Sequence, residues 1–317
     1  MKEIIYISSG RALLLILLNE KIKTDRLYIT SELCYLNEDL INKMKIIEIP
    51  GERKKIKKVF NAVRTYNYLR KITKNSSKII LSMDHDLIGL IFILLKKDYI
   101  LYEEGIVNYN FQGVWWSKLL EKMKIKIKNY GRNGNAQKIY LTGLASVPKE
   151  ISSKVEIINL KELWNKKSIL EQNKILEIFS FDLNTKEKIK DKNIILFTQP
   201  LSEDLIITED EKIKIYSKII EKYPKNKLII KTHPREKTDY KNLFKECLVL
   251  NNPFPFEILN LLDIKFDKVI TLFSTAALGL GKEIEVDFYG TEVHPKILER
   301  FGSCENIMKR NCFFKEE

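Results

Sequence analysis

One imidazole of the sequence stands directly after a predicted strand, where a side chain can do chemistry. Residues 228–236 read LIIKTHPRE, an apolar strand followed by His233 and Pro234. In open α/β folds, ligands bind at the carboxyl ends of the strands. Pro234 fixes its own φ and biases His233 towards an extended conformation, which would aim the ring outward from the sheet edge. The ring could then donate a proton or a hydrogen bond to a leaving phosphate oxygen. A histidine before a turn proline also suits a plain loop.

A pair of adjacent acids follows another predicted strand. Residues 98–102 are mostly apolar, and Glu103, Glu104 and Gly105 come next. Two neighbouring carboxylates repel each other, which can raise the pKa of one of them, and Gly105 would let the backbone turn sharply. A carboxylate in this position could take the proton of a sugar hydroxyl. The alternative interpretation is a pair of solvated loop acids.

Two hydroxyl side chains mark the end of a third strand. Ser274 and Thr275 follow the predicted strand 268–272 and precede a helix that begins at Ala276. A helix N-terminus offers free N–H groups and the positive end of the helix dipole, so two hydroxyls there could hold one phosphate. Plain N-capping would use the same groups.

Two more polar positions fit the same arrangement. Gln199 and Pro200 end the predicted strand 193–198, and Glu257 opens a helix just after Pro255. Each of these signals is weak alone. Together they repeat one geometry, because the tips of parallel strands converge at one edge of a sheet.

Positioning these residues requires two sheets. In the first half, the pattern predicts helices at 12–18, 53–68 and 116–128 between strands at 3–8, 27–29, 45–49, 78–83, 98–102 and 138–142. In the second half, it predicts helices at 209–222 and 276–280 between strands at 193–198, 228–231, 248–250, 268–272 and 286–289. This alternation is typical of doubly wound α/β units. The 317 residues are enough for two domains. We therefore expect two Rossmann-like domains, 1–150 and 193–317, that face each other across a cleft and are joined by a helical connection, 151–192.

The composition is that of a globular protein with a surplus of positive charge. Lys and Arg number 55 against 42 Asp and Glu, a formal charge of +13, which favours anionic partners. The lysines are spread along the whole chain, however, and no nucleic-acid module is present, so nucleic-acid binding is disfavoured. The four cysteines form no CxxC pair, which disfavours a disulfide framework or zinc site and predicts a cytoplasmic protein. The apolar runs 12–18 and 87–95 are too short to span a bilayer, and the N-terminus reads as a first strand and not as a signal peptide.

Several of these motifs resemble those of bacterial sialyltransferases. YEEGIVNY at 102–109 resembles the (D/E)(D/E)G motif, KTHP at 231–234 the HP motif, and FSTA at 273–276 the Ser-Ser/Thr motif. PFEIL at 255–259 resembles the segment whose glutamate holds the ribose of CMP. Their order and spacing are most similar to glycosyltransferase family 52, which includes lipooligosaccharide and capsule sialyltransferases.

The resemblance implies a GT-B fold, CMP-N-acetylneuraminate (CMP-Neu5Ac) as donor, and transfer to a terminal galactose-type hydroxyl with inversion and without a metal or other cofactor. Domain 1–150 would bind the acceptor, and domain 193–317 the nucleotide sugar. The residue roles carried over comprise Glu104 as general base, His233 as general acid or phosphate-oxygen donor, Ser274 and Thr275 on the phosphate, Glu257 on the ribose, Gln199, Pro200 and Pro234 in the CMP site, and Ser9 and Arg11 on the acceptor side. Glu103, Asp204 and Asp210 are supporting or alternative bases, because some related enzymes draw the base from a loop near the HP segment.

Other interpretations stay open at this point. Another cytidine-nucleotide enzyme, a Kdo or polyol-phosphate transferase, would use similar HP and Ser-rich motifs. Trp115 and Trp116 precede a lysine-rich helix that could lie on the inner face of the membrane or be an ordinary amphipathic helix, and a homodimer is compatible with the sequence. The run 84–86, Asp-His-Asp, fits a structural or acceptor-lining role better than a metal site. We expect His294 and Pro295 to form a loop near the nucleotide.

Overall fold

The computed structural model describes residues 2–21, 23, 26–31, 44, 46–49, 55–109, 128–274 and 284–303, without the side chains of 55–60 and 183. The chain divides into two compact units, Met1–Ile175 and Leu176–Glu317. Each unit contains its own parallel sheet. No helix among the described residues has the length and apolar character needed to cross a bilayer.

The first unit is built on a seven-stranded sheet in which all pairings are parallel. Its strands are β1 (Lys2–Ile7), β2 (Leu27–Thr30), β3 (Ile46–Glu48), β4 (Ser76–Leu81), β5 (Tyr99–Tyr102), β6 (Ala136–Leu141) and β7 (Val155–Ile157). The order is β3-β2-β1-β4-β5-β6-β7. The chain therefore changes direction across the sheet between β1 and β4. Ligands of doubly wound folds bind at the carboxyl ends of the strands at such a point.

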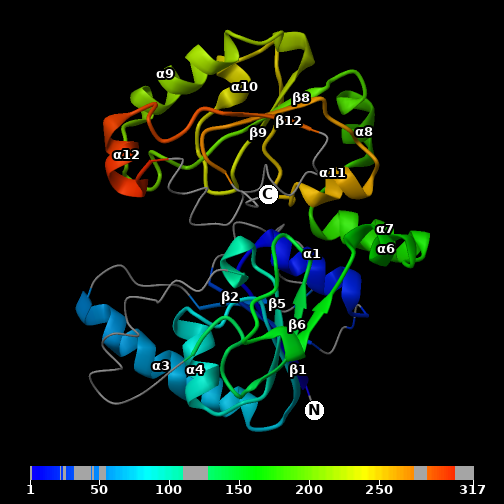
Figure 1. Cartoon of the computed structure of the whole chain (residues 1–317), viewed down its shortest axis with the longest axis vertical. Coiled ribbons are helices and arrows are strands. Elements are labelled where there is room, and N and C mark those ends of the chain that lie inside the picture. The colour runs from blue at the N-terminus through cyan, green and yellow to red at the C-terminus, as the bar shows by residue number, and fades with distance from the viewer. Residues whose placement is uncertain are drawn as a thin grey trace. The chain divides into compact units, whose positions relative to one another are not determined.

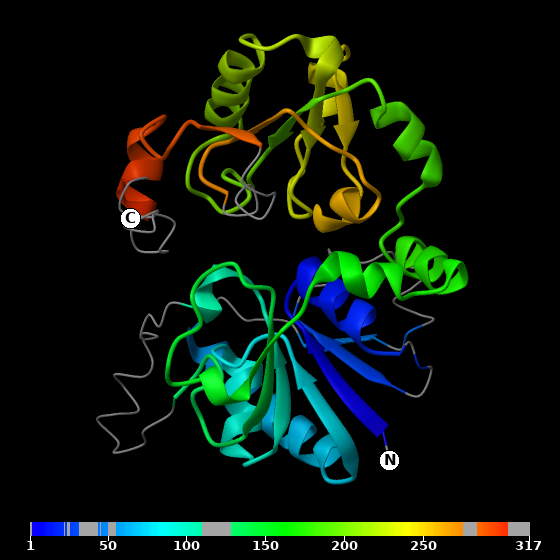
Figure 2. The same cartoon turned by 45° about the vertical axis from the view of Figure 1, so that its right-hand side comes forward.

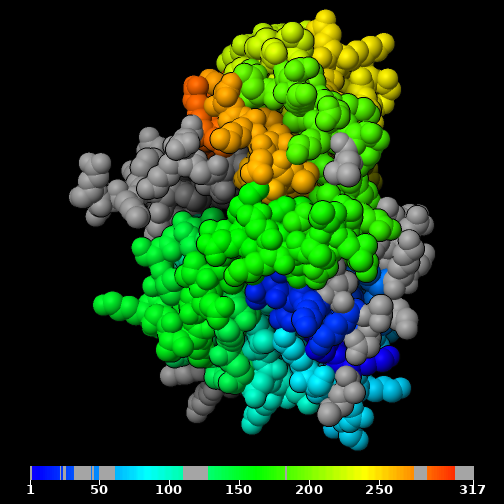
Figure 3. Space-filling model, turned by 90° about the vertical axis from the view of Figure 1, so that its right-hand side faces the viewer, coloured from blue at the N-terminus to red at the C-terminus, as the bar shows by residue number. Residues whose placement is uncertain are grey.

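Helices cover both faces of this sheet. The helices of the unit are α1 (Gly10–Asn19), α3 (Lys55–Thr73), α4 (Leu87–Leu94) and α6 (Leu160–Asn165), with 3-10 turns η1 (Ile106–Asn108) and η2 (Ser152–Lys154). Figure 1 shows α1 on one side of the sheet and the packed pair α3 and α4 on the other. The residues from Ala12 to Leu18 are almost fully buried, because α1 lies between the sheet and α6, whose green side chains lie on the blue ones of α1 in Figure 3. A helix that is apolar all round is expected in such an enclosed position.

The second unit repeats the plan with five parallel strands. They are β8 (Ile194–Phe197), β9 (Leu228–Lys231), β10 (Leu248–Leu250), β11 (Lys268–Thr271) and β12 (Glu285–Phe288), in the order β10-β9-β8-β11-β12. The direction of winding changes between β8 and β11. The strand before His233 is buried at all four positions, as the apolar run predicted.

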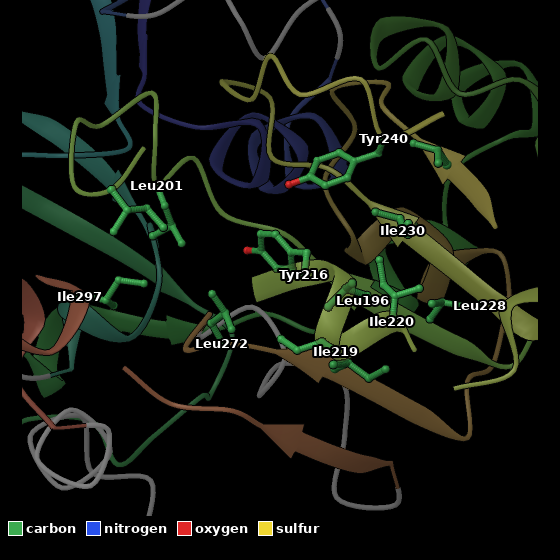
Figure 4. Close-up of a cluster of buried hydrophobic side chains, with 13 residues drawn as sticks. Leu196, Leu201, Tyr216, Ile219, Ile220, Leu228, Ile230, Tyr240, Leu272 and Ile297 are labelled. Carbon is green, nitrogen blue, oxygen red and sulfur yellow. The ribbon is translucent and has the colours of Figure 1, made fainter. Parts of the chain in front are cut away.

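The helices of the second unit are α8 (Leu183–Ile189), α9 (Glu209–Ile220), α10 (Tyr240–Leu243), α11 (Glu257–Leu261) and α12 (Pro295–Phe301), with the 3-10 turn η3 (Lys225–Lys227). Figure 2 shows the yellow strand and helix segments of this unit from a second side. Figure 4 shows the core between α9 and the sheet, in which the rings of Tyr216 and Tyr240 lie edge to face with their hydroxyls on the same side. Both hydroxyls serve the site described below.

Within the described residues, the structure bears out most of the elements predicted from the pattern and adds others, among them β7 and α12. β7 lies inside the stretch 151–192 that we expected to be a helical connection, and the two units part within α7 (Ile169–Ile178). Pro295 begins helix α12, with His294 as its N-cap through Nδ1. This pair is therefore a helix start and not the loop that we expected. Trp115, Trp116 and the predicted helices at 116–128 and 276–280 lie outside the described residues, except for Lys128.

Candidate active site

The tips of β1 and β4 are joined at the winding change of the first sheet. The backbone N–H of Ser8 donates to Oγ of Ser82 at 2.7 Å, and Oγ of Ser82 donates to Oγ of Ser8 at 2.9 Å. One residue further on, Ser9 caps α1 by accepting a hydrogen bond from the backbone of Ala12. These contacts fix the loop from which Arg11 extends.

Glu103 is fully buried and its carboxylate is occupied. Oε1 accepts from Arg11 Nη2 at 2.5 Å and from the hydroxyl of Thr142 at 2.7 Å. Oε2 accepts from the backbone N–H of Thr142 and from the hydroxyl of Tyr109. A buried carboxylate held by an arginine and three other donors is an anchor between strands. Of the two adjacent acids, this one has no lone pair directed at open space.

Glu104 has the opposite environment. Its Oε2 is buried and makes no hydrogen bond to the described residues, while 23% of the side chain is exposed. Burial, followed by the negative charges of Asp86 and Asp84, raises the pKa of Glu104 to about 8. Glu103, which we expected to repel Glu104, is not among the causes of this raised pKa. Its own carboxylate is paired with Arg11. The acids of the loop 84–86 supply that repulsion instead.

The backbone at Glu104 is held by a side chain that the motif did not reveal. Oδ1 of Asn108 accepts from the backbone N–H groups of Glu104 at 2.9 Å and Gly105 at 3.3 Å. Gly105 itself has an extended conformation, with φ 164° and ψ −155°, and the chain bends at this residue into the 3-10 turn η1, as we expected. A Cβ at Gly105 would meet nothing within 4 Å. The space that a side chain would take at this position is therefore open.

The three residues of the loop after β4 have different partners. Asp84 accepts from the backbone N–H groups of Tyr130 and Gly131 and from the hydroxyl of Tyr99. It is a structural anchor, although burial raises its pKa.

Asp86 and His85 complete this loop. Asp86 caps α4 through the backbone N–H of Gly89 and accepts from Tyr6, and burial raises the pKa of Asp86 to about 6. The ring of His85 stacks on Tyr130 with 4.4 Å between centroids, and its Nε2 lies 3.7 Å from Oε2 of Glu104. Burial lowers the pKa of His85 to about 4, so the ring is neutral at pH 7. The first unit therefore brings a proton-accepting carboxyl and a neutral imidazole to one edge of its sheet.

The second unit places His233 at the tip of β9, as the sequence predicted. Nδ1 accepts a hydrogen bond from the backbone N–H of Arg235 at 3.1 Å, which leaves the proton of the neutral ring on Nε2. Burial, together with the charges of Arg235 and Lys231, lowers the pKa of His233 to about 4. At pH 7 the ring is thus a neutral donor through Nε2.

A buried charge cluster fixes the loop that carries His233. Glu236 accepts from the backbone N–H of His233 at 2.8 Å and from the hydroxyls of Thr198 and Tyr240. Lys212 of α9 is fully buried, 2.9 Å from Glu203 and 3.8 Å from Glu236. The loop is therefore tied both to the tip of β8 and to α9.

Two of the predicted nucleotide residues, Gln199 and Ser274, lie at the winding change of the second sheet. The backbone N–H of Phe273, at the tip of β11, donates to Oε1 of Gln199 at 3.4 Å, and the backbone N–H of Gln199 donates to the hydroxyl of Tyr216. The backbone N–H of Ser274 donates to Oγ1 of Thr271. Thr275 lies outside the described residues.

The other predicted residues of this unit have varied settings. Pro200 is buried, Pro234 is partly buried, and Glu257 is the first residue of α11. Asp204 pairs with Arg235 through both carboxylate oxygens, and Asp210 is exposed in the first turn of α9. Neither acid is buried without a partner as Glu104 is.

Metal ligands were not expected at this site. In the part of the chain that the structure describes, no group of three or more His, Cys, Asp or Glu side chains is placed to hold a metal ion. Both acids of the loop 84–86 accept hydrogen bonds from backbone N–H groups and tyrosine hydroxyls.

Comparison with known proteins identifies the family. The family model of glycosyltransferase family 52 matches residues 12–297, most of the chain. The chain belongs to glycosyltransferase family 52. This glycosyltransferase is also 44% identical, over 254 residues, to an uncharacterized protein of Haemophilus influenzae, a match that covers 79% of this chain and 81% of that one.

Solved structures show the same fold at low sequence identity. A 2,6-sialyltransferase of Photobacterium sp., in complex with CMP and lactose, is 13% identical with a TM-score of 0.60 over 99% of this chain and 77% of that one. The GT-B domain of a sialyltransferase from Photobacterium damselae is 14% identical with a TM-score of 0.57 over 100% and 98% of the two chains. A UDP-GlcNAc 2-epimerase of Neisseria meningitidis is 12% identical with a TM-score of 0.51 over 98% and 90%. The family 52 glycosyltransferase thus has a GT-B type fold, as expected.

Proposed function

We propose that this glycosyltransferase is an inverting sialyltransferase that moves N-acetylneuraminic acid from CMP-Neu5Ac to a terminal galactose-type hydroxyl of a surface glycan, without a metal. The observation that carries the proposal is the buried, unpartnered Oε2 of Glu104 at the carboxyl edge of the first sheet. A carboxyl kept from water and from other donors is suited to take a proton from a substrate hydroxyl.

In the proposed reaction, Glu104 is the general base. The acceptor oxygen attacks the anomeric carbon while its proton passes to Glu104. The bond between that carbon and the phosphate oxygen breaks, and its electron pair leaves with CMP. Attack on the face opposite the leaving group inverts the configuration. Water is a poor competitor if the acceptor hydroxyl fills the space next to Gly105.

His233 acts on the leaving group. Its neutral ring carries a proton on Nε2, so the ring can donate a hydrogen bond to a non-bridging or departing phosphate oxygen. The dianion that builds up on CMP would raise the pKa of this imidazole and favour full proton transfer. Both roles predicted from the sequence, donor and acid, are therefore stages of one interaction.

The remaining predicted residues would hold CMP. Gln199, Ser274 and Thr275 would contact the phosphate, with Pro200 and Pro234 shaping the loops on which these contacts depend, and Glu257 would accept from the ribose hydroxyls. A monophosphate leaving group carries little charge beyond what such neutral donors can stabilise. Support for a cytidine donor and a galactoside acceptor comes from the Photobacterium 2,6-sialyltransferase, whose structure contains CMP and lactose.

The donor is tested by comparing three nucleotides. The purified chain is incubated with CMP-Neu5Ac, CMP-Kdo or CDP-glycerol, with lactose as acceptor and with and without EDTA. The proposal expects CMP release and sialyl-lactose from CMP-Neu5Ac only, unchanged by EDTA, with the product in the inverted configuration by NMR. Turnover of CMP-Kdo or CDP-glycerol instead would support the second candidate, another cytidine-nucleotide transferase.

The residues are tested in the same assay. His233→Ala and Glu104→Gln should each lower kcat by at least about a hundredfold, while His294→Ala, a helix-capping histidine, serves as the matched control. An active Glu104→Gln variant would move the role of base to Asp204 or Asp210.

We also propose that the enzyme works in the cytoplasm at the inner face of the membrane, where a nucleotide sugar and a growing surface glycan can meet. Cell fractionation tests this location.

A further inference from the structure

A buried carboxyl oxygen and an imidazole nitrogen face each other in the first unit. Nε2 of His85 and Oε2 of Glu104 are 3.7 Å apart, with only 19% and 23% of the two side chains exposed. The carboxyl oxygen has no hydrogen-bond partner among the described residues. Buried polar atoms are nearly always hydrogen-bonded, so a buried carboxyl oxygen left without a partner at a strand edge indicates that a ligand supplies the bond.

The contact between the two groups is not itself a bond. A separation of 3.7 Å is too long for a hydrogen bond, and an ion pair would need a protonated imidazole. Burial lowers the pKa of His85 to about 4, so the ring is neutral wherever Glu104 can act as a base. One small group that donates to the carboxylate and accepts from the N–H of the ring could bond both.

The imidazole is held in place by its neighbours. The ring of His85 lies parallel to that of Tyr130, 24° between planes, and Tyr130 is itself fixed by the bond from its backbone N–H to Asp84. Its backbone has φ 54°, an unusual value for a residue with a side chain. A Cβ on Gly89 would come within 2.4 Å of Asp84, so α4 packs tightly on the same loop. His85 is thus directed at Glu104 by a rigid frame.

A metal ion is a poor ligand for His85 and Glu104. The other acids of the loop, Asp84 and Asp86, are used by backbone N–H groups and tyrosine hydroxyls. Only one imidazole and one carboxyl remain, and no set of three ligands occurs in the described part of the chain.

We propose that His85 is a second acceptor-binding residue, and that its Nε2 and Oε2 of Glu104 hold the same acceptor hydroxyl, the one that becomes glycosylated. This inference rests on the proposed function and names a residue and a ligand class for its acceptor site: a neutral sugar that presents a free hydroxyl. The hydroxyl donates to Glu104 and accepts from His85 Nε2–H. One lone pair of the oxygen stays free for the anomeric carbon.

His85 exchanges no proton in this scheme. The O–H bond of the acceptor breaks towards Glu104, the new carbon–oxygen bond forms, and CMP leaves with the electron pair of the old one. The hydrogen bond from His85 orients the attacking oxygen, which is where a small displacement has a large effect on rate.

Steady-state kinetics separates this role from a structural one. His85→Ala should lower kcat/KM for the acceptor at least about tenfold, the effect of one lost hydrogen bond to a neutral group, while KM for CMP-Neu5Ac stays unchanged. His85→Gln places an N–H close to the Nε2 position and should recover most of the loss. An equal loss in both variants, or an acceptor kcat/KM in His85→Ala equal to that of the wild type, would overturn the proposal.

A binding measurement decides the matter independently of turnover. The chain contains three histidines, His85, His233 and His294, so histidine-labelled protein gives three imidazole signals, assigned with the single variants. Titration with lactose, galactose or N-acetyllactosamine should shift the His85 signal and leave that of His294 in place. Glu104→Gln should keep this shift, because a neutral amide can still accept from the hydroxyl.

The two proposals fail in different ways. If no acceptor is sialylated yet one of these sugars shifts His85, the proposed function is wrong and the hydroxyl site stands. If sialyl transfer occurs and none of the sugars shifts His85 at concentrations well above KM, the site assigned to His85 is wrong and the function stands.

Discussion

The carboxylate of Glu236 accepts a hydrogen bond from the backbone N–H of His233 at 2.8 Å. The two residues are three apart in one turn, and the same carboxylate accepts from Thr198, the residue after β8, and from Tyr240 on α10. Its side chain is only 1% exposed. The direction of the imidazole at the tip of β9 therefore depends on a buried carboxylate.

Removing one acceptor atom of Glu236 tests this dependence. Glu236→Gln keeps the shape but turns one oxygen into an N–H₂ group, so a single acceptor atom remains for three donors that now use two. We expect kcat to fall about tenfold or more, with KM for the sugar acceptor unchanged and a shifted NMR signal for His233. Glu246→Gln is the matched control, since Glu246 is 70% exposed and pairs with Lys225 on the surface. A normal rate with a displaced His233 signal would show that the orientation of the ring is unimportant.

The buried Lys212 should matter for stability. It is fully buried and lies within 4 Å of Glu203, Glu209 and Glu236. Lys212→Met removes the cation and leaves buried carboxylates uncompensated, which costs about 3 to 5 kcal/mol. Urea unfolding of the full chain should show this loss. Lys225→Met, at an exposed ion pair, should change the free energy of unfolding by less than about 1 kcal/mol; similar values for both would contradict the assigned role of Lys212.

Most of the scaffold could be predicted, because a strand that is covered on both faces of its sheet appears in the sequence as a continuous apolar run. The strand 228–231 was predicted to the residue, and the motif acids and His233 were placed at strand tips. β7 was missed because it is three residues long and only one of its residues, Val155, is even partly buried. The helix after His294 was missed because an HP dipeptide was read as a loop, although Pro at the first helical position is favourable.

The partners of the motif residues were harder to foresee. Which of two adjacent glutamates is free depends on Arg11, 92 residues away, and spacing in sequence carries no such information. Asn108 was within reach, since it stands inside the YEEGIVNY run, but its amide bonds backbone groups that a pattern does not display. Lys212 sits on a helix whose other lysines are exposed, so its burial has no sequence signal.

The neutral Glu104 should make the fold more stable in acid than in base. Its folded pKa is about 8 against about 4.5 in an unfolded chain. A group whose pKa is higher in the folded than in the unfolded chain stabilises the fold fully at pH values below its unfolded pKa. This stabilisation is lost as the pH rises through its folded pKa. The loss between pH 5 and 9 should reach about 2 kcal/mol or more, given partial exposure of the side chain.

A Glu104→Gln variant tests this linkage, because its amide resembles the neutral acid and does not ionise. The variant should match the wild type near pH 5 and be the more stable of the two near pH 9, in thermal or urea unfolding. Glu103→Gln is the contrasting variant. It breaks a buried pair with Arg11 and should be less stable at both pH values. A stability difference between wild type and Glu104→Gln that is the same at pH 5 and pH 9 would rule out the raised pKa.

The same group should set the pH dependence of catalysis. A general base must be deprotonated, so kcat/KM for the acceptor should rise with pH and level off above the pKa of Glu104, about 8. His233 is neutral above its own pKa of about 4 and adds no falling limb in this range.

After burial, the charge of Asp86 is the largest cause of the raised pKa of Glu104. Asp86→Asn, which can still cap α4, should therefore move the rising limb to lower pH. Asp204→Asn, whose carboxylate pairs with Arg235 in the other unit, should leave the limb where it is. A limb that stays near 8 in Asp86→Asn, or that lies near 4.5 in the wild type, would mean that Glu104 is not the base.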